Sequence, residues 1–338
     1  MLNGKAILIT GGTGSFGKKF LEMVLDRYTP NRIIIYSRDE FKQSVMKDEF
    51  QKKHDMSKVR FFIGDVRDKD RLYRAFDQVD YVIHAAAMKQ VPTCEYNPFE
   101  AIKTNIHGAQ NVIDAAIDRR VKKVVALSTD KAVNPINLYG GTKLVSDKLF
   151  ISANAYSKIS NTKFSVVRYG NVAGSRGSVI PVFKNLIEKG ETELPITDPR
   201  MTRFWIKLEQ GAELVFKALE ESNGGETYIS KIPSFRITDL AEAMLPGAKI
   251  KEIGIREGEK LHEVMVTKDD STHTYEYEKH FIIYPHFDWW KSDRSLTGNG
   301  VKVREGFEYN SETNKEWLDV SGLRSELENL HSCSINHI

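Results

Sequence analysis

Cysteine is scarce in this sequence, which contains only Cys94 and Cys333 among its 338 residues. Two thiols are too few for a disulfide framework or a cysteine-based metal cluster, so we expect a reducing, cytoplasmic setting and no metal. Long apolar runs are also missing. None approaches the ~20 residues that cross a bilayer, and the N-terminus lacks the apolar region of a signal peptide. We therefore expect a soluble protein without a membrane partner.

A surplus of charge of one sign is lacking as well. The sequence holds 49 Lys and Arg against 46 Asp and Glu, which gives a formal net charge of +3. This balance provides no broad basic surface for a phosphate backbone, so nucleic acid is not an expected partner. What the sequence does have is 41% hydrophobic residues, enough for a sizeable core in one large domain or two interleaved ones.

The first half of the chain alternates short apolar runs with longer helical patterns. Several of the runs are apolar almost throughout, as is typical of parallel strands that are covered on both faces. The strands predicted in this way cover residues 5–10, 32–37, 59–65, 80–87, 122–128 and 164–170. The alternation predicts an α/β fold with a doubly wound parallel sheet of the Rossmann type.

The composition changes after residue 170, where Gly, Pro, Ser and Thr become frequent. We predict a dinucleotide-binding domain over 1–170 and a smaller, loop-rich substrate-binding part over 171–290, some of whose segments return to the first domain. An extension without an assigned role follows over 291–338, with polar loops and then a helix near 315–330.

Three glycines follow the first predicted strand directly. Gly11, Gly14 and Gly17 stand at three-residue spacing, at the start of a helical stripe, and the spacing occurs nowhere else in the chain. Glycine permits a tight turn and close approach to a pyrophosphate, and a helix N-terminus supplies free N–H groups and a favourable dipole. The motif predicts a dinucleotide site, and the alternative is a strand-to-helix turn without a ligand.

The end of the second strand bears on which dinucleotide binds. An acidic residue there would accept a hydrogen bond from the ribose of NAD, but the sequence places Ser37 and Arg38 before Asp39, and arginine suits the 2′-phosphate of NADP. We predict NADP; the alternative is that Arg38 pairs with Asp39 or Glu40 at the surface. Asp65, at the end of the third strand, is placed to hold the adenine amine.

Tyr139 and Lys143 are four residues apart, so on a helix they share one face. An ammonium near a phenol lowers its pKa, which makes the tyrosine a proton acceptor for a substrate hydroxyl. The same spacing occurs at Tyr275 and Lys279. Only the first pair follows the fifth strand closely, where the carboxyl edge of the sheet places it beside the cofactor, so we interpret the second as a chance match.

The glycine loop, the strand order and the Tyr–Lys pair resemble the extended short-chain dehydrogenase/reductase family over about residues 4–265. Within it, "STDK" (128–131), "HAAAMKQVP" (84–92), "RYGNVAGSRGSVIP" (168–181), "MTRFW" (201–205) and "GIREGEKLHE" (254–263) are similar to the inverting UDP-N-acetylglucosamine 4,6-dehydratases that begin pseudaminic acid synthesis. The resemblance implies UDP-N-acetylglucosamine as substrate, NADP as cofactor, and assembly into a dimer or hexamer.

The same resemblance implies a reaction cycle and a role for each residue. Hydride leaves C4 of the sugar for NADP, water is eliminated across C5 and C6, and the hydride returns to C6 with inversion at C5. Tyr139 is the base at the C4 hydroxyl, Lys143 holds it and the nicotinamide ribose, and Thr129 bonds the C4 oxygen. Lys131 and Asp130 are the base for C5 and the acid for the departing C6 hydroxyl.

Physical chemistry places two demands on that last pair. Lys131 must be partly neutral to act as a base, although a neighbouring carboxylate raises its pKa, so we expect Asp130 to be protonated and the two residues to share or exchange a proton. Consecutive residues of a strand also point to opposite faces. Both can serve one sugar only if the chain leaves β geometry at Thr129 or Asp130. Without the resemblance, a solvated Lys131 is the simpler interpretation.

Further site residues follow from the matching segments. An arginine clamp on the diphosphate and a carboxylate on the uridine ribose make chemical sense, and the alternative for either arginine is a surface salt bridge. We expect His84, Cys94, Trp289 and Trp290 to be packing residues, of which the two tryptophans lie outside the residues that the structure describes. The implied cofactor site also includes Thr13, Ser15, Phe16, Lys42, Val66, Ala85, Ala86 and Lys89. The implied sugar-nucleotide site comprises Lys89, Asn171, Val179, Pro181, Thr197, Arg203, Arg256 and Glu259.

Two other functions fit parts of the pattern. A nucleotide-sugar C4 or C5 epimerase would share the fold, the cofactor pocket and the Tyr139–Lys143 pair, but a C4 epimerase needs no acid and base for C5 and C6. A catalytically silent NADP-binding regulator would keep the glycine loop and lose the tyrosine chemistry, which the presence of both Tyr139 and Lys143 disfavours.

Overall fold

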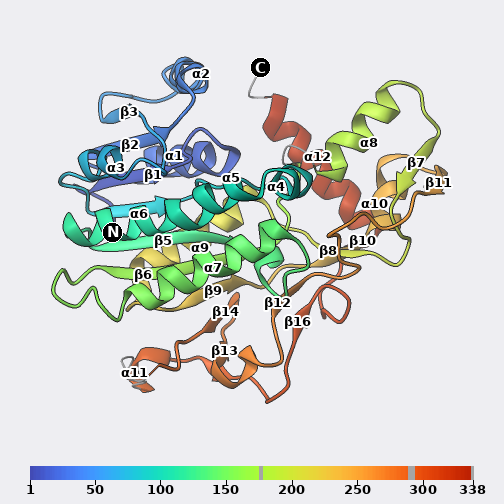
Figure 1. The fold of residues 1–338 in the computed structure, drawn as a ribbon. Coiled ribbons are helices and arrows are strands. Elements are labelled where there is room, and N and C mark those ends of the chain that lie inside the picture. The colour runs from blue at the N-terminus through green and yellow to red at the C-terminus, as the bar shows by residue number, and fades with distance from the viewer. Residues whose placement is uncertain (175–177, 288–293, 336–338) are drawn as a thin grey trace.

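The computed structural model describes residues 1–174, 178–287 and 294–335 and is built around a ten-stranded sheet (Figure 1). The strand order is β15-β13-β14-β9-β6-β5-β4-β1-β2-β3. All six predicted strands are present and run parallel to one another: β1 (Ala6–Thr10), β2 (Arg32–Ser37), β3 (Val59–Ile63), β4 (Tyr81–His84), β5 (Lys123–Thr129) and β6 (Lys163–Tyr169). The doubly wound α/β fold is confirmed.

The far side of the sheet is formed by strands that the sequence patterns did not reveal. β9 (Thr227–Ser230) extends the parallel part beside β6, and β14 (His280–Ile283), β13 (Thr274–Glu276) and β15 (Val301–Lys302) continue it as antiparallel neighbours. Each has only two to four residues, which is too short for a periodic pattern to stand out.

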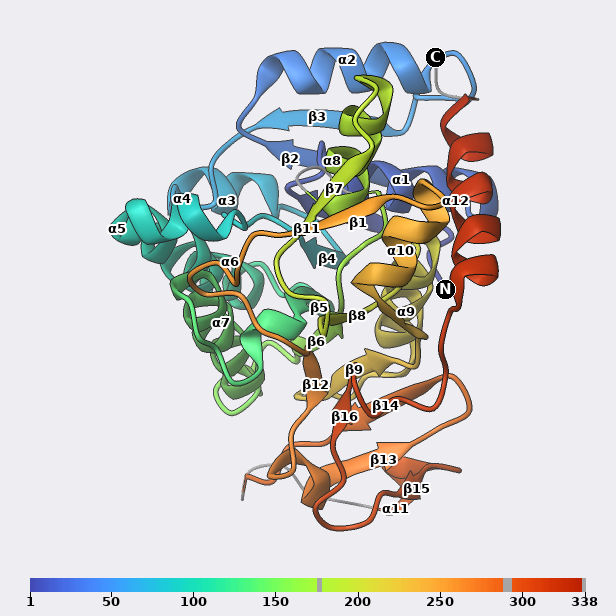
Figure 2. The same cartoon turned by 90° about the vertical axis from the view of Figure 1, so that its right-hand side faces the viewer.

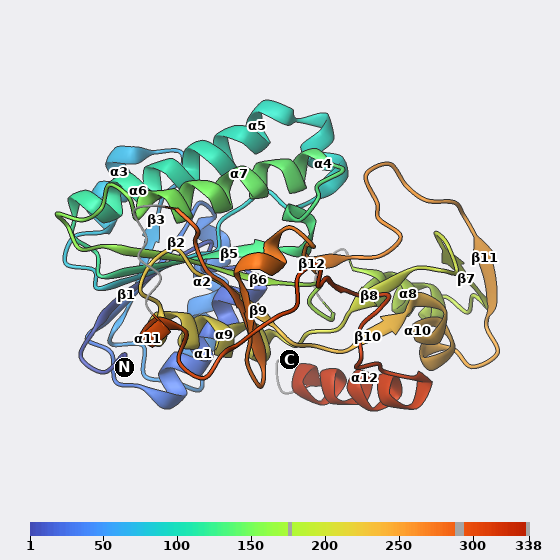
Figure 3. The ribbon, with the colours of Figure 1, turned by 90° about the horizontal axis from the view of Figure 1, so that it is seen from below.

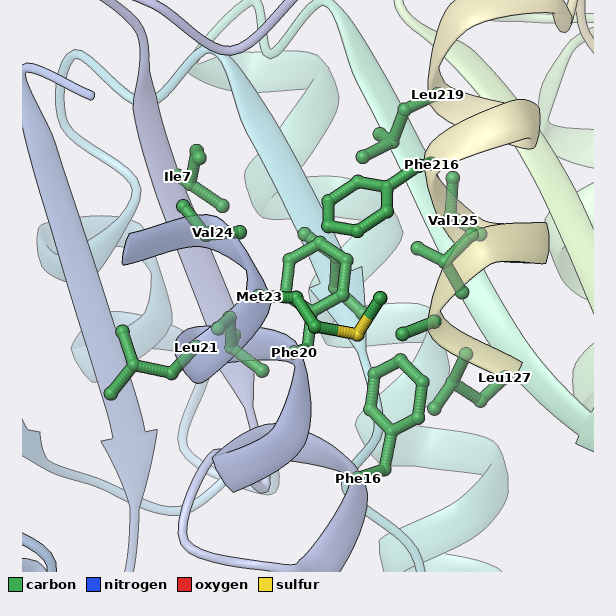
Figure 4. Close-up of a cluster of buried hydrophobic side chains, with 14 of the residues drawn as sticks. Ile7, Phe16, Phe20, Leu21, Met23, Val24, Val125, Leu127, Phe216 and Leu219 are labelled. Carbon is green, nitrogen blue, oxygen red and sulfur yellow. The ribbon is translucent and has the colours of Figure 1, made fainter. Parts of the chain in front are cut away.

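Helices cover both faces of the sheet, as Figure 3 shows from below. α1 (Ser15–Arg27), α2 (Glu40–Phe50) and α9 (Leu208–Glu221) contribute buried side chains to the core of one face, and α3 (Lys69–Ala75), α6 (Gly108–Asp118) and α7 (Leu138–Ala153) to that of the other. In the first core, the rings of Phe20 on α1 and Phe216 on α9 stack at 4.7 Å (Figure 4). This packing fixes α1 and therefore the loop that precedes it.

Short elements connect the fourth and fifth strands. α4 (Val91–Tyr96) and α5 (Pro98–Ile102) are followed by one π-helical turn over Lys103–His107, which leads into α6. Both α4 and α5 pack against α7. Together with α7 they enclose a small core of Cys94, Ala101 and Tyr139, so Cys94 is a packing residue, as expected.

A smaller lobe stands at one end of the sheet, on the right in Figure 1 and toward the viewer in Figure 2. It contains α8 (Val179–Glu188), the parallel pair β7 (Glu193–Ile196) and β11 (Lys249–Glu252), the antiparallel pair β8 (Thr202–Phe204) and β10 (Ser234–Arg236), and α10 (Ile237–Met244). Its separate core includes Phe183, Trp205 and Leu240. α12 (Val320–Ile335) joins this core through Leu323 and Leu327.

The C-terminal segment is thus integrated into both parts of the molecule. The predicted helix is α12, and it packs against α10. β12 (Val264–Val266) is followed along the chain by a 3₁₀ turn at Asp270–His273 and the short α11 (Arg294–Thr297). β16 (Tyr309–Asn310) then returns to pair with β12 before α12 begins. In the part of the chain that the structure describes, no helix combines the length and the apolar character needed to cross a bilayer.

Candidate active site

A cavity of about 800 Å³ opens where the carboxyl ends of β1 to β6 face the smaller lobe. Every residue predicted to bind the cofactor lines it, and so do Thr129, Lys131, Tyr139 and Lys143 of the predicted catalytic set. Of the described candidates, two are not among the lining residues: Pro181 on α8, and Asp130, whose side chain is fully buried. The other candidates for sugar-nucleotide binding do line it, namely Lys89, Asn171, Val179, Thr197, Arg203, Arg256 and Glu259.

The glycine loop has the geometry that a dinucleotide requires. Gly11 has a φ of +64°, and a Cβ there would lie 2.9 Å from the backbone of Ala85, while a Cβ on Gly17 would collide with Gly12. α1 begins at Ser15 after Gly14, with no side-chain cap among the described residues and no acid in its first turn. Its first N–H groups are thus available to a diphosphate. These residues fit a bound dinucleotide.

Basic side chains gather where the ribose end of a dinucleotide would lie. Arg38 is 58% exposed and approaches Asp65 at 3.7 Å, rather than pairing with Asp39 or Glu40. Asp39 caps α2 through the backbone N–H of Lys42 at 2.9 Å and also pairs with its ammonium. Asp39 is therefore engaged at the helix end, and Arg38 keeps an exposed guanidinium at the rim of the cavity.

The turn that follows β5 carries the Asp–Lys pair. Thr129 is extended, with φ −149° and ψ 155°, and the chain then turns into a 3₁₀ helix over Asp130–Ala132. The expected departure from β geometry is confirmed. Nζ of Lys131 lies 3.2 Å from Oδ1 of Asp130, 2.9 Å from Oδ1 of Asn171 and 3.3 Å from Oε1 of Glu263. Thr129 donates a hydrogen bond to Asp130 at 2.8 Å.

The charges around Lys131 determine its resting state. Burial raises the pKa of Asp130, and the nearby carboxylate of Glu263 raises it further. Burial alone would lower the pKa of Lys131, but the carboxylates of Asp130 and Glu263 outweigh it and raise that pKa above its ordinary value. Lys131 is therefore an ammonium at rest. A neutral amine requires that a proton pass to Asp130, the carboxylate whose pKa is raised.

Tyr139 and Lys143 lie on the first turns of α7 and are both almost fully buried. Nζ of Lys143 donates to the carbonyl of Leu127 at 2.8 Å. Burial raises the pKa of Tyr139 to about 12, and the ammonium that opposes this shift belongs to Lys131. The sequence-based expectation that Lys143 lowers the phenol's pKa is wrong for the protein by itself, because desolvation is the larger effect.

Gly140 lets α7 close onto the catalytic turn. A Cβ at this position would collide with the carbonyl of Lys131 and lie 3.0 Å from Cβ of Pro135, whereas a Cβ on the adjacent Gly141 meets no described atom within 4 Å. The absence of a side chain at Gly140 therefore brings Tyr139 and Lys131 into one site.

A pair of glycine substitutions tests this packing. Gly140→Ala is expected to cost about 1–3 kcal/mol of unfolding free energy, because overpacking forces the turn away from the helix, and to reduce turnover as well. Gly141→Ala is expected to stabilise by roughly 0.5–1 kcal/mol, the helix-propensity difference between the two residues. Urea unfolding and turnover of both variants provide the measurement. Equal stability of the two would refute the packing argument.

Arg203 is less open than a simple diphosphate clamp. It is 8% exposed, and its guanidinium donates to the carbonyls of Thr202 at 2.8 Å and Leu261 at 3.0 Å. It also approaches Glu259 at 3.5 Å and Glu263 at 3.9 Å. Arg203 thus holds the wall of the cavity together, whereas Arg256 is exposed at its rim.

Sequence reasoning overlooked Glu263. The residue lies inside the matching segment "GIREGEKLHE", just before β12, and is 2% exposed while lining the cavity. An acid that directly precedes an apolar strand was the available signal, because a charged group is rarely buried there without a partner.

Two other sequence-based interpretations concern residues outside the cavity. His84 is buried and bonded to Thr10 at 2.8 Å, and burial lowers its pKa to about 3, so it is a neutral packing residue, as expected. Tyr275 lies in β13, in edge contact with Tyr284, and is not among the described residues that line the cavity. Its spacing to Lys279 is a chance match.

The fold and the site define an enzyme of the extended short-chain dehydrogenase/reductase class. The chain belongs to the family of polysaccharide biosynthesis proteins, whose model it matches over residues 7–285. It is 58% identical to the UDP-N-acetylglucosamine 4,6-dehydratase (inverting) of Campylobacter jejuni (strain 81-176), over 96% of this chain and 97% of the relative. The resemblance found in the sequence is confirmed, and with it the expectation of a hydro-lyase.

Two further comparisons frame this result. The UDP-glucose 4-epimerase of Rickettsia canadensis is 46% identical, over 79% of this chain and 79% of the relative. The X-ray structure of Pen from Bacillus thuringiensis is 40% identical, with a TM-score of 0.88 over 98% of this chain and 99% of the other.

Proposed function

We propose that the protein is a C5-inverting 4,6-dehydratase of UDP-N-acetylglucosamine. The observation that carries this proposal is the placement of Lys131 in the same cavity as Tyr139 and Lys143, with its amine 3.2 Å from a buried carboxyl. An enzyme that only oxidises or reduces its substrate needs Tyr139 and Lys143 but not Lys131. The additional base and acid are what an elimination requires, because the C5 proton and the C6 hydroxyl must both leave.

The residues of this chain divide the work. Tyr139 accepts the proton of the C4 hydroxyl and Lys143 holds the site in place, while a bound dinucleotide supplies reversible hydride chemistry at C4 and C6. The resulting 4-keto group acidifies the C5 proton, which Lys131 takes. Asp130 lies below the cavity, and Thr129 and Lys131, which both contact it and line the cavity, connect it to the departing hydroxyl.

We infer that the dinucleotide is NADP. Arg38 and Lys42 line the rim next to Ser37, and two cations suit a 2′-phosphate better than the diol of NAD. Mass analysis of the nucleotide released by denaturing the purified protein tests this assignment, and recovery of NAD alone would overturn it. The same proposal includes assembly into a dimer or hexamer, which light scattering would test. It also includes a cytoplasmic location and a product that feeds pseudaminic acid synthesis.

Incubation with UDP-N-acetylglucosamine in deuterated water tests the reaction. We expect a 4-keto-6-deoxy sugar nucleotide with the inverted configuration and deuterium at C5, because the C5 proton exchanges through Lys131 before it returns. Mass spectrometry and NMR of the product provide the measurement.

The same experiment examines the second candidate, a C4 epimerase, which the 46% identical Rickettsia relative favours. A C4 epimerase would convert the sugar without deuterium at C5 and without loss of the C6 hydroxyl. Tight NADP binding without turnover of any UDP-sugar would instead indicate a regulator.

A further inference from the structure

The amine of Lys131 is held by three acceptors, one adjacent in the sequence and two from distant parts of the chain. Asp130 is its neighbour, Asn171 follows β6, and Glu263 precedes β12. An ammonium has three donors, so these contacts account for all of them. Of the two carboxylates, Asp130 is fully buried, whereas Glu263 lines the cavity beside Lys131.

Glu263 is itself held rigidly. Its backbone N–H donates to Oγ of Ser311 at 2.9 Å, and its carbonyl accepts from the N–H of Ser311 at 2.8 Å. Ser311 is fully buried and also bonds the hydroxyl of Thr202 at 2.7 Å. The C-terminal extension, to which the sequence analysis assigned no role, thus fixes the backbone of Glu263 through Ser311.

The charges that face this group come from several elements. Asp130 and Lys131 belong to the turn after β5, Arg203 to β8 and Lys260 to the loop before β12, and Tyr139 of α7 faces Lys131. Although burial raises the pKa of Glu263, Lys131, Arg203 and Lys260 outweigh it, so the pKa is lowered and Glu263 stays ionised. Asp130 has the opposite shift. The two carboxyl groups therefore differ in role: one can hold a proton and the other does not.

We propose that Glu263 is a positioning residue for the elimination step, which orients the amine of Lys131 and balances the positive charge that Lys131 gains from C5. This inference rests on the proposed function. In the step, the proton of C5 passes to the neutral Lys131 and its electron pair forms the C5–C6 double bond. The C6–O bond breaks, and the hydroxyl leaves as water with the proton held by Asp130. The products are the ammonium of Lys131 and the carboxylates of Asp130 and Glu263.

A Glu263→Gln substitution removes the charge and keeps the shape. We expect C5 deuterium exchange and dehydrated product to fall about 100-fold, as for loss of a group that supports proton transfer. The rate of oxidation at C4, measured in a single turnover from the absorbance of the reduced cofactor, should stay within about twofold of the wild-type rate. An equal loss of both steps would mean a structural role only and would overturn the inference.

The pH profile of C5 exchange supplies a readout that a structural role would not move. Glu263 raises the pKa of both Asp130 and Lys131, so its removal lowers both. The Asp130–Lys131 pair must carry one shared proton to react, and both limbs of the bell-shaped profile are therefore expected to shift to lower pH in Glu263→Gln. Unshifted limbs would contradict the inference.

Two more variants keep the test decisive. Glu263→Asp retains the charge at shorter reach, so we expect slower exchange with unshifted limbs, and it carries the test if Glu263→Gln does not fold. Glu226→Gln is the matched control, because Glu226 is also buried but bonds the N–H groups of Asn223 and Gly224, away from the cavity. If the wild type itself neither exchanges the C5 proton nor forms product, the proposed function fails. If the wild type does both and Glu263→Gln does so at the same rates, the proposed function stands and only the inference about Glu263 fails.

Discussion

A Lys131→Gln variant is expected to lose dehydration by about a thousandfold, within the range that a positioned general base contributes, while oxidation at C4 continues. Glutamine ends one atom earlier and has two N–H donors instead of three, so it can still donate to part of the set that surrounds the lysine, Asp130 Oδ1, Asn171 Oδ1 and Glu263 Oε1. What it cannot do is take a proton from C5. The substitution therefore distinguishes the role of Lys131 as a base from its role in holding the neighbouring side chains in place.

Three measurements check this prediction. The variant should incorporate no deuterium at C5 in deuterated water, form no 6-deoxy sugar above background, and accumulate the reduced cofactor after substrate is added, because hydride leaves C4 and finds no acceptor at C6. Lys123→Gln is the control, since Lys123 begins β5, the strand that ends just before the turn with Lys131, and donates to the carbonyl of Glu220. A Lys131→Gln enzyme that dehydrates at the wild-type rate would disprove the assigned role.

The sheet domain was predictable because its determinants are local. Five of the six parallel strands, β1, β2, β4, β5 and β6, are buried along most of their length and mainly apolar, as strands covered on both faces must be. β3, at the edge of the sheet, is only partly buried. The helix that carries Tyr139 and the glycine turn before α1 follow from short motifs whose spacing fixes their geometry. The carboxyl ends of parallel strands share one edge, so the residues after them were expected to meet, and the cavity brings them together.

The remainder of the site depends on contacts between segments that are far apart in the sequence. Lys131 and Glu263 are separated by 132 positions, and Glu263 and Ser311 by 48. No periodicity relates such residues. Whether Asp130 points into the cavity or below it depends on one 3₁₀ turn, and the pKa of Tyr139 depends on how completely α4, α5 and α7 exclude water. Burial of this kind is a property of the assembled fold.

In a Tyr139→Phe variant, we expect oxidation at C4 and all later steps to fall together by about a thousandfold. Only the phenolic oxygen is removed, and the ring keeps its contacts with the core around Cys94 and Ala101, so thermal unfolding should change little. Because the phenol must lose its proton and its pKa is about 12, the wild-type oxidation rate should rise with pH below that value. The variant should lose this dependence.

The chance match elsewhere in the chain provides the control for this experiment. Tyr275 has a lysine four residues later, as Tyr139 does, but it stands in β13 of the sheet extension. Tyr275→Phe should therefore leave oxidation, C5 exchange and product formation at wild-type rates. The decisive comparison is a single-turnover measurement of both variants across pH. If Tyr139→Phe oxidised the sugar as fast as Tyr275→Phe, another group would have to be the base at C4, and the site would contain a different oxidation chemistry.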